Sequence, residues 1–120
     1  MGGAQGEGVS AAREDDHWLV IDGRRWRRTD PSLPADLIER LKSHLGRGRS
    51  AVRAGKNHAD ADAVADARKR VGLAKLGLGE RGPYWWNETP AARSDRARDA
   101  LRQLDALDQT EHTETRHPDE

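Results

Sequence analysis

The chain has 120 residues, of which 35% are charged and 34% hydrophobic, and its formal net charge is zero. This length accommodates one domain, and the small apolar fraction limits the surface that folding can bury. The absence of cysteine excludes disulfides and thiolate metal sites and favours a reducing compartment. The sequence shows no signal peptide and no run long enough to span a membrane. We therefore expect a cytoplasmic protein.

The zero net charge conceals an uneven distribution. Residues 1–16 carry a net charge of −3, residues 17–58 a net charge of +6, and residues 90–120 a net charge of −3. Two interpretations are open: the basic centre binds an anionic partner, or the acidic ends keep a basic domain soluble. We expect residues 1–16 to form a disordered acidic tail.

Residues 17–29 read as a β-hairpin. Asp22-Gly23 is a strong signal for a two-residue type I′ turn, and it pairs Leu19 with Trp26 across the strands. A two-stranded hairpin is marginally stable in water, so it is expected to pack on the rest of the domain. Side chains alternate between faces along a strand. The face expected to pack on the helices carries Leu19, Ile21 and Trp26.

Two apolar seams follow, each with successive spacings of 3, 4, 3 and 4 residues. This spacing is typical of helices that pack in the manner of a coiled coil, and one antiparallel register pairs every position. We expect helices over 34–54 and 58–78, with Gly55 just past the first and Asn57 capping the second. The seams consist of Ile38, Leu41, Leu45, Gly48 and Val52, and of Val64, Ala67, Val71, Ala74 and Leu78.

Residues 79–89 form the predicted aromatic closure of this helical hairpin. Trp26 is expected to meet Trp85 or Trp86 there and to be buried against this segment. Residues 17–89 would then make a single small α+β domain, with the β-hairpin packed on the helical hairpin. The charged segment 90–120 is expected to form a third helix over 91–108, docked or free, and then to be disordered.

Two motifs carry a resemblance to a known family. The first is W-x-x-x-D-G-R-R-W-R-x-x-D-P, which starts at Trp18, and the second is G-E-R-G-x-x-W-W, which ends at Trp86. With the helical hairpin between them, residues 17–86 resemble a family of small uncharacterised bacterial proteins, some of which are labelled "biopolymer transporter Tol". The resemblance implies a fold and no activity or catalytic residue.

The clearest candidate for a binding site is a set of arginines. Four of them flank Trp26 in the hairpin, and such a run can contact phosphates while an indole stacks on a base. No nucleophilic constellation is visible, and His58, Asp62 and Asp66 on one helix face would form only an open, weak cation site. No catalytic residue, metal or cofactor is therefore expected. The predicted polyanion-binding residues are Arg24, Arg25, Arg27, Arg28, Arg47 and Arg49.

These observations favour a non-enzymatic interaction module that binds an unidentified protein partner. The alternative is a nucleic-acid-binding accessory protein that uses the basic hairpin. An oligomer is compatible with the sequence, and no membrane association is expected. The placement of the arginines separates the two hypotheses, since convergence on one exposed face favours polyanion binding and pairing with carboxylates opposes it.

Overall fold

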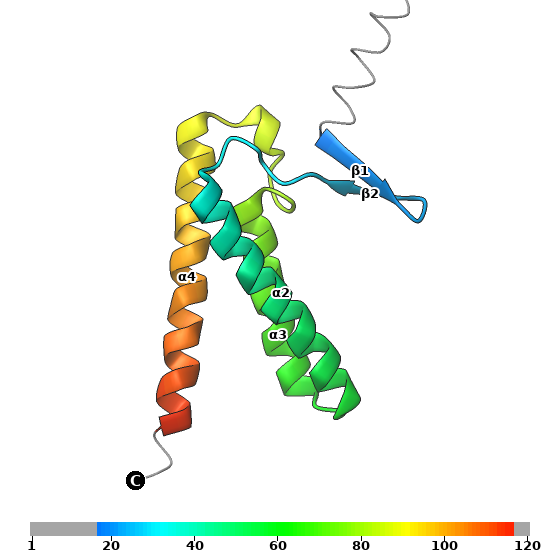
Figure 1. The fold of residues 1–120 in the computed structure, drawn as a ribbon, viewed down its shortest axis with the longest axis vertical. Helices are drawn as coiled ribbons and strands as arrows, with labels where there is room; N and C mark the ends of the chain where they lie inside the picture. Colours follow the sequence, from blue (N-terminus) through cyan, green and yellow to red (C-terminus); the bar gives the residue numbers. More distant parts are fainter. Residues whose placement is uncertain (1–16, 117–120) are drawn as a thin grey trace, which may run out of the picture.

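The computed structural model describes residues 17–116, with side chains described as far as residue 109, and has the small α+β architecture expected from the sequence (Figure 1). A β-hairpin projects from one end of three helices. Two of these helices pack as an antiparallel hairpin, while the third diverges from them toward its C-terminal end. The elements are β1 (Trp18–Ile21), β2 (Arg24–Arg27), α2 (Ala35–Asn57), α3 (Ala61–Leu78), η1 (Trp85–Asn87) and α4 (Pro90–Arg116).

The β-hairpin has the predicted register. Leu19 pairs with Trp26 and Trp18 with Arg27. The turn residues Asp22 and Gly23 have φ angles of 53° and 78°, both in the left-handed region that a type I′ turn requires. The sheet contains only β1 and β2 among the described residues, so both of its outer edges lack a neighbouring strand.

The helical hairpin is confirmed, but its turn lies further along the chain than predicted. α2 continues to Asn57, and the cap of α3 is Asp60, whose Oδ1 accepts a hydrogen bond from the Ala63 N–H at 3.0 Å. The predicted cap at Asn57 is therefore wrong. Gly55 is buried inside α2, where an added Cβ would lie 2.8 Å from Cγ2 of Val64. This glycine permits close helix contact instead of ending the helix.

The third helix is docked on the other two and is longer than predicted. It runs to Arg116 instead of ending near residue 108. Residues from α2, α3 and α4 share one apolar core, so the core extends beyond the predicted 17–89 domain. α4 contributes Ala97, Ala100, Leu101 and Leu104 to it. The predicted tail 1–16 lies outside the described residues.

The aromatic closure forms, but the contacts differ from the prediction. Trp26 is 37% exposed, and its ring lies beside the cations Arg24 and Lys75 rather than Trp85 or Trp86. The expected burial of Trp26 is therefore wrong. Trp18, from the opposite strand face, packs edge-on against Trp86, with 5.7 Å between the ring centroids. Trp18, and not Trp26, is thus the hairpin tryptophan that contacts the closure.

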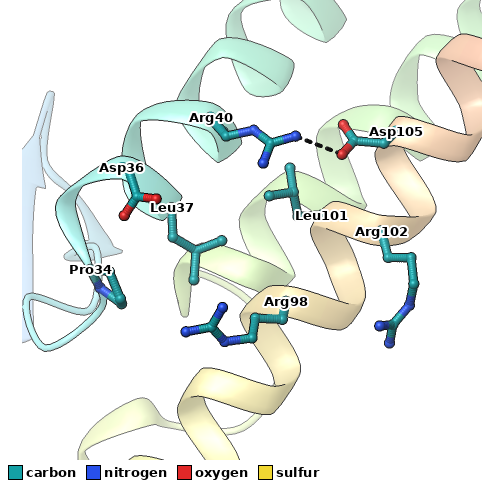
Figure 2. A pocket seen from close by; sticks show the side chains of 8 residues that line it. All are labelled: Pro34, Asp36, Leu37, Arg40, Arg98, Leu101, Arg102 and Asp105. Carbon is teal, nitrogen blue, oxygen red and sulfur yellow. Dashed lines mark hydrogen bonds and ion pairs between the residues drawn. The ribbon is translucent and has the colours of Figure 1, made fainter.

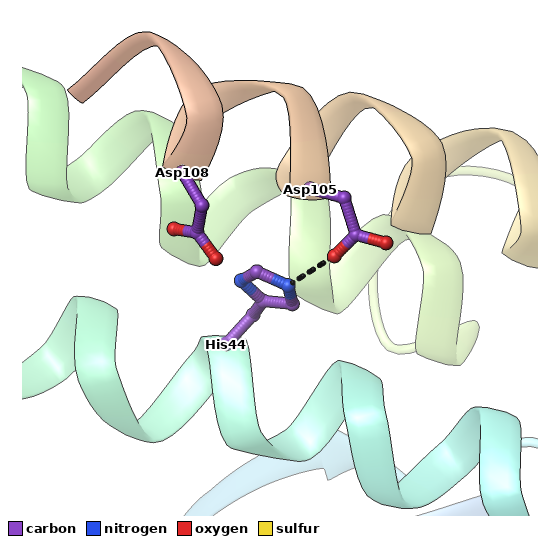
Figure 3. Close-up of side chains that lie close together, drawn as sticks. All are labelled: His44, Asp105 and Asp108. Atoms are coloured by element: carbon purple, nitrogen blue, oxygen red, sulfur yellow. Dashed lines mark hydrogen bonds and ion pairs between the residues drawn. The ribbon is translucent and has the colours of Figure 1, made fainter. Parts of the chain in front are cut away.

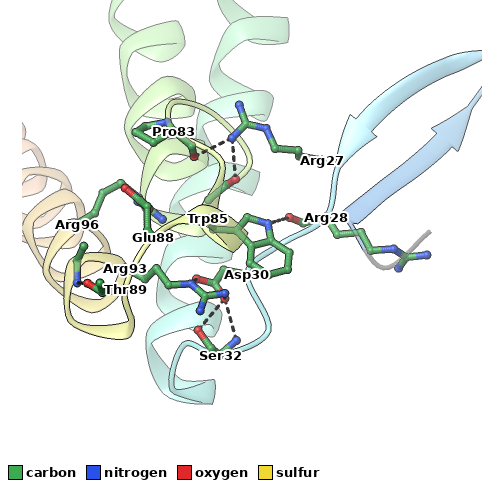
Figure 4. A network of polar contacts seen from close by, with 12 residues as sticks. Arg27, Arg28, Asp30, Ser32, Pro83, Trp85, Glu88, Thr89, Arg93 and Arg96 are labelled. Atoms are coloured by element: carbon green, nitrogen blue, oxygen red, sulfur yellow. Dashed lines mark hydrogen bonds and ion pairs between the residues drawn. The ribbon is translucent and has the colours of Figure 1, made fainter. Parts of the chain in front are cut away.

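A polar junction fixes the base of the hairpin to the helices (Figure 4). Asp30 is fully buried, and its carboxylate accepts hydrogen bonds from Arg93 of α4 at 3.0 and 3.2 Å and from Ser32. The indole N–H of Trp85 donates to the Arg28 carbonyl at 3.0 Å, and Arg27 donates to the Pro83 carbonyl at 2.9 Å. The hairpin therefore has a firmly held base.

Two glycine-to-alanine changes are expected to act in opposite directions. An added Cβ at Gly77 would lie 2.9 Å from both Ala100 and Leu41, so Gly77→Ala should destabilise the protein by about 1–3 kcal/mol. An added Cβ at Gly46 would meet nothing within 4 Å, so Gly46→Ala should stabilise α2 by about 1 kcal/mol. Urea denaturation of the two variants measures both changes. Equal effects would contradict the close packing at Gly77.

Candidate functional site

The exposed large hydrophobic side chains gather in one region. Among the residues whose side chains are described, they are Val20 at 71%, Ile21 at 52%, Trp26 at 37% and Tyr84 at 47% exposed. The first three belong to the β-hairpin, and Tyr84 lies in the segment beneath it. Val20 lies on one face of the hairpin, and Ile21 and Trp26 lie on the other. Apolar exposure gathered at one end of a small domain is typical of an interaction site. We call Val20, Ile21, Arg24, Arg25 and Trp26 the hairpin surface.

Cations cover the aromatic rings of this region. The Arg25 guanidinium lies 4.1 Å from the ring centroid of Trp18, and that of Arg24 lies 4.8 Å from the centroid of Trp26. The ammonium of Lys75 lies 5.0 Å from the same Trp26 ring. Cation–π contacts of this kind hold the guanidinium groups in place without neutralising them.

The rings beneath the hairpin stack on one another. Trp86 stacks with His17, with 4.1 Å between ring centroids, and with Tyr84, with 4.8 Å. Trp85, only 6% exposed, meets both His17 and Trp86 edge-on. The aromatic faces available for a ligand are therefore largely occupied by side chains of this chain.

A hollow of about 590 Å³ lies at the base of the hairpin. It is bordered by Leu19 of β1, Lys42 of α2 and the buried Trp85, together with Arg28. No carboxylate lines this hollow. The positive charge of the hairpin thus continues onto the adjacent side of α2.

The predicted arginines do not all converge. Arg24 and Arg25 lie on the hairpin surface, whereas Arg27 is held at its base by backbone carbonyls and contacts Tyr84. Arg47 pairs with Asp108 of α4 at 3.2 Å, away from the hairpin. Arg49 is exposed on α2. The pKa of Lys75 is lowered first by the burial of Lys75 itself, then by the charge of Arg81 and then by the charge of Arg49. Arg28 borders the hollow described above.

A second cluster joins α2 to α4 (Figure 3). His44, Asp105 and Asp108 place potential metal-ligating atoms within 4.8 Å of one another. Those atoms are already engaged, because His44 Nε2 lies 3.1 Å from Asp105 Oδ1 and His44 Nδ1 lies 2.8 Å from Arg70 and 3.0 Å from Arg47. A bound cation would face these guanidinium groups at close range. We therefore assign the cluster to interhelical ion pairing.

The sequence alone did not indicate this cluster, because His44 lies in α2, the two aspartates lie in α4 and their partner Arg70 lies in α3. Arg70 is 6% exposed, and its guanidinium also pairs with Asp108 at 2.9 Å. The available signal was the placement of Asp105 and Asp108 three residues apart, on the same side of α4 as its apolar stripe. Charged residues beside the apolar stripe of a helix indicate oppositely charged partners on the helix against which that stripe packs.

Asp108 gives α4 docking an acid dependence. Partial burial raises the pKa of this carboxyl, but Arg70 and Arg47 outweigh that effect and hold the pKa below its ordinary value of 3.8. Asp108 thus stabilises the folded state above about pH 4, and this contribution disappears as the pH falls through the lowered pKa.

The stability difference between wild type and Asp108→Asn should therefore be present at about pH 6 and shrink by about pH 3. Urea denaturation measures it, with Asp95→Asn, exposed on the same helix, as the control. A difference that persists unchanged at the lower pH would contradict this role.

A cavity of about 330 Å³ lies between α2 and α4 (Figure 2). The arginines around it have partners within the chain: Arg40 pairs with Asp105 at 2.8 Å, and Arg102 pairs with Asp99 at 2.8 Å. Arg98 donates to Ser94 Oγ at 3.1 Å. The groups do not converge on one point, and their charges are mixed. This cavity has no arrangement suited to a defined reaction.

No helix within residues 17–116 combines the length and apolar character needed to cross a membrane. No protein-family model, curated protein or solved structure matches the chain. The family resemblance of residues 17–86 therefore stays a prediction from two sequence motifs. The hairpin surface, with its exposed apolar side chains and stacked guanidinium groups, is the strongest candidate site on the described part of the chain.

Proposed function

We propose that this chain is a non-enzymatic, cytoplasmic interaction module that binds a protein partner through its projecting hairpin. One observation carries the proposal: the exposed large hydrophobic side chains of the described residues all lie on the hairpin or directly beneath it. A hairpin fixed at its base and free at its tip can offer these side chains to a partner without unfolding (Figures 1 and 4). The absence of cysteine supports the cytoplasmic location.

Nucleic-acid binding is the alternative, and the ring contacts oppose it. Recognition of single strands relies on aromatic faces that are free to stack on bases. The rings of Trp18 and Trp26 instead lie against the cations of Arg25 and Arg24, and Trp86 stacks with two neighbouring rings. Arg47, which was expected to enlarge the basic surface, pairs with a carboxylate of α4. These contacts favour a protein partner.

Site-specific photo-crosslinking tests the proposal. A photoreactive amino acid replaces Ile21 at the hairpin tip or, as the control, Arg68 on the exposed side of α3. Each protein is irradiated in nuclease-treated and untreated lysate. The expected result is a discrete protein adduct from position 21 that survives nuclease and is absent from position 68. Adducts that vanish with nuclease would favour nucleic acid, and equal adducts at both positions would contradict a dedicated hairpin site.

A further inference from the structure

We propose that the partner presents an acidic, extended segment whose carboxylates pair with Arg24 and Arg25 and whose apolar side chains cover Val20 and Ile21. This inference rests on the proposed interaction function and specifies the chemistry of the partner. It combines three features of the described residues: guanidinium groups without carboxylates, apolar exposure beside them, and open strand edges.

Arg24 and Arg25 differ from the arginines that hold the helices together. Among the described residues, six arginines of the helices pair with carboxylates of this chain: Arg40, Arg47, Arg70, Arg93, Arg96 and Arg102. Arg24 and Arg25 contact indole rings, and within residues 17–109 the structure gives neither of them a carboxylate partner. A guanidinium stacked on a ring keeps its N–H groups directed outward in its own plane, and this fork matches a carboxylate. The two groups are thus held in position for an acidic ligand.

The surroundings reinforce the positive charge. Asp22 is the only acidic residue between residue 17 and Thr29, a stretch that contains four arginines. Lys75 lies over Trp26, and Lys42 borders the hollow at the hairpin base, which has no carboxylate in its lining. Complementary charge selects partners and accelerates their encounter. A second copy of the hairpin would bring like charges together, so the charge favours a different, acidic chain.

Backbone geometry favours an extended partner. The Arg28 N–H donates to the His17 carbonyl at 2.8 Å, so His17 and Arg28 form a hydrogen-bonded pair. In an antiparallel ladder such pairs alternate with non-hydrogen-bonded pairs, so the next hydrogen-bonded pair is Leu19–Trp26. The Val20–Arg25 pair is then non-hydrogen-bonded, so the backbone N–H and C=O groups of these residues point away from the hairpin. A strand added at either edge satisfies such groups, and its successive side chains extend alternately to the two faces of the sheet. One face carries Val20 and Arg25 and the other carries Ile21 and Arg24. A strand that has an acidic and an apolar side chain on each face can therefore reach both arginines.

The experiment uses the full chain and fluorescent peptides of about ten residues in which two glutamates alternate with two valines or isoleucines, so that each face of the extended peptide carries both kinds of side chain. Matched peptides carry glutamine in place of glutamate, and an oligothymidylate represents nucleic acid. Fluorescence polarisation measures the affinities of wild type, Arg24→Gln/Arg25→Gln, and Arg24→Lys/Arg25→Lys. The control is Arg53→Gln/Arg68→Gln, which removes two exposed arginines from α2 and α3. Thermal unfolding verifies that each variant is folded.

We expect saturable binding of a glutamate peptide, at least about ten-fold weaker binding of its glutamine counterpart, and a similar loss in the Arg24→Gln/Arg25→Gln variant. The lysine variant should recover part of the affinity, and the control should bind like wild type. Equal binding of both peptides, equal loss in the control, or tighter binding of the oligothymidylate would overturn the inference. So would the absence of acidic-peptide binding up to about 1 mM. A nuclease-resistant crosslink at position 21 would in that case still support the interaction function.

Discussion

Replacing Leu41 with alanine is expected to lower the free energy of unfolding by about 3–5 kcal/mol. Leu41 is completely buried, and its Cδ atoms lie 2.9 and 3.2 Å from the point that a Cβ on Gly77 of α3 would occupy. Ala100 of α4 reaches the same point, so three helices meet around this side chain. The truncation would leave a cavity that these rigid neighbours cannot easily fill.

Urea denaturation followed by circular dichroism measures this change. A small domain has a total stability of only about 5–15 kcal/mol, so the variant should be largely unfolded at moderate temperature if wild type lies near the lower limit. Val20→Ala is the matched control, because Val20 is mainly exposed and its truncation should change stability by less than about 0.5 kcal/mol. Similar losses in both variants would show that Leu41 is not the centre of the core.

Replacing Asp30 with alanine is expected to cost about 3–5 kcal/mol, since it breaks a buried ion pair. The Asp30 carboxylate is fully buried and accepts hydrogen bonds from Arg93 and Ser32. Without it, the Arg93 guanidinium, whose side chain is 15% exposed, loses its carboxylate partner. The change should therefore weaken the attachment of α4 as well as that of the hairpin base.

Calorimetry of three variants tests this role. Asp30→Ala should lower the unfolding temperature strongly, while Asp30→Ala/Arg93→Leu should recover part of the loss because no uncompensated charge is left. Asp99→Ala removes an exposed carboxylate that also pairs with an arginine, and it should have little effect. If the double variant is no more stable than the single one, the cost does not arise from the stranded guanidinium.

Local patterns predicted much of the fold. The Asp22-Gly23 turn determines the hairpin register, because a two-residue turn leaves no other pairing of the adjacent residues. The apolar spacing likewise predicted the antiparallel packing of α2 on α3. The ends of these helices were harder to predict, since Gly55 matches both a helix terminus and a close contact. Only the three-dimensional structure, which places Val64 against Gly55, shows that this glycine serves a close helix contact.

The candidate site was predicted only in part. The sequence indicated the basic hairpin, and alternation along its strands leaves Trp18 and Arg25 on the same face, where their side chains are in contact. It did not show which of the two strand faces meets the closure, because both faces carry a tryptophan. Nor did it show the docking of α4, whose apolar stripe is narrow and whose attachment depends on polar contacts with residues distant in the sequence. Asp30 and Arg93 are one such pair.

The separation of Asp30 and Arg93 by 63 positions has a kinetic consequence. The α2–α3 hairpin brings together residues that are close in sequence, so it can form early, whereas a loop of this length closes at a greater entropic cost. The buried ion pair should therefore form late in folding and open early when the protein partially unfolds. Amide hydrogens at the start of α4 should then exchange with solvent faster than those at the centre of α3.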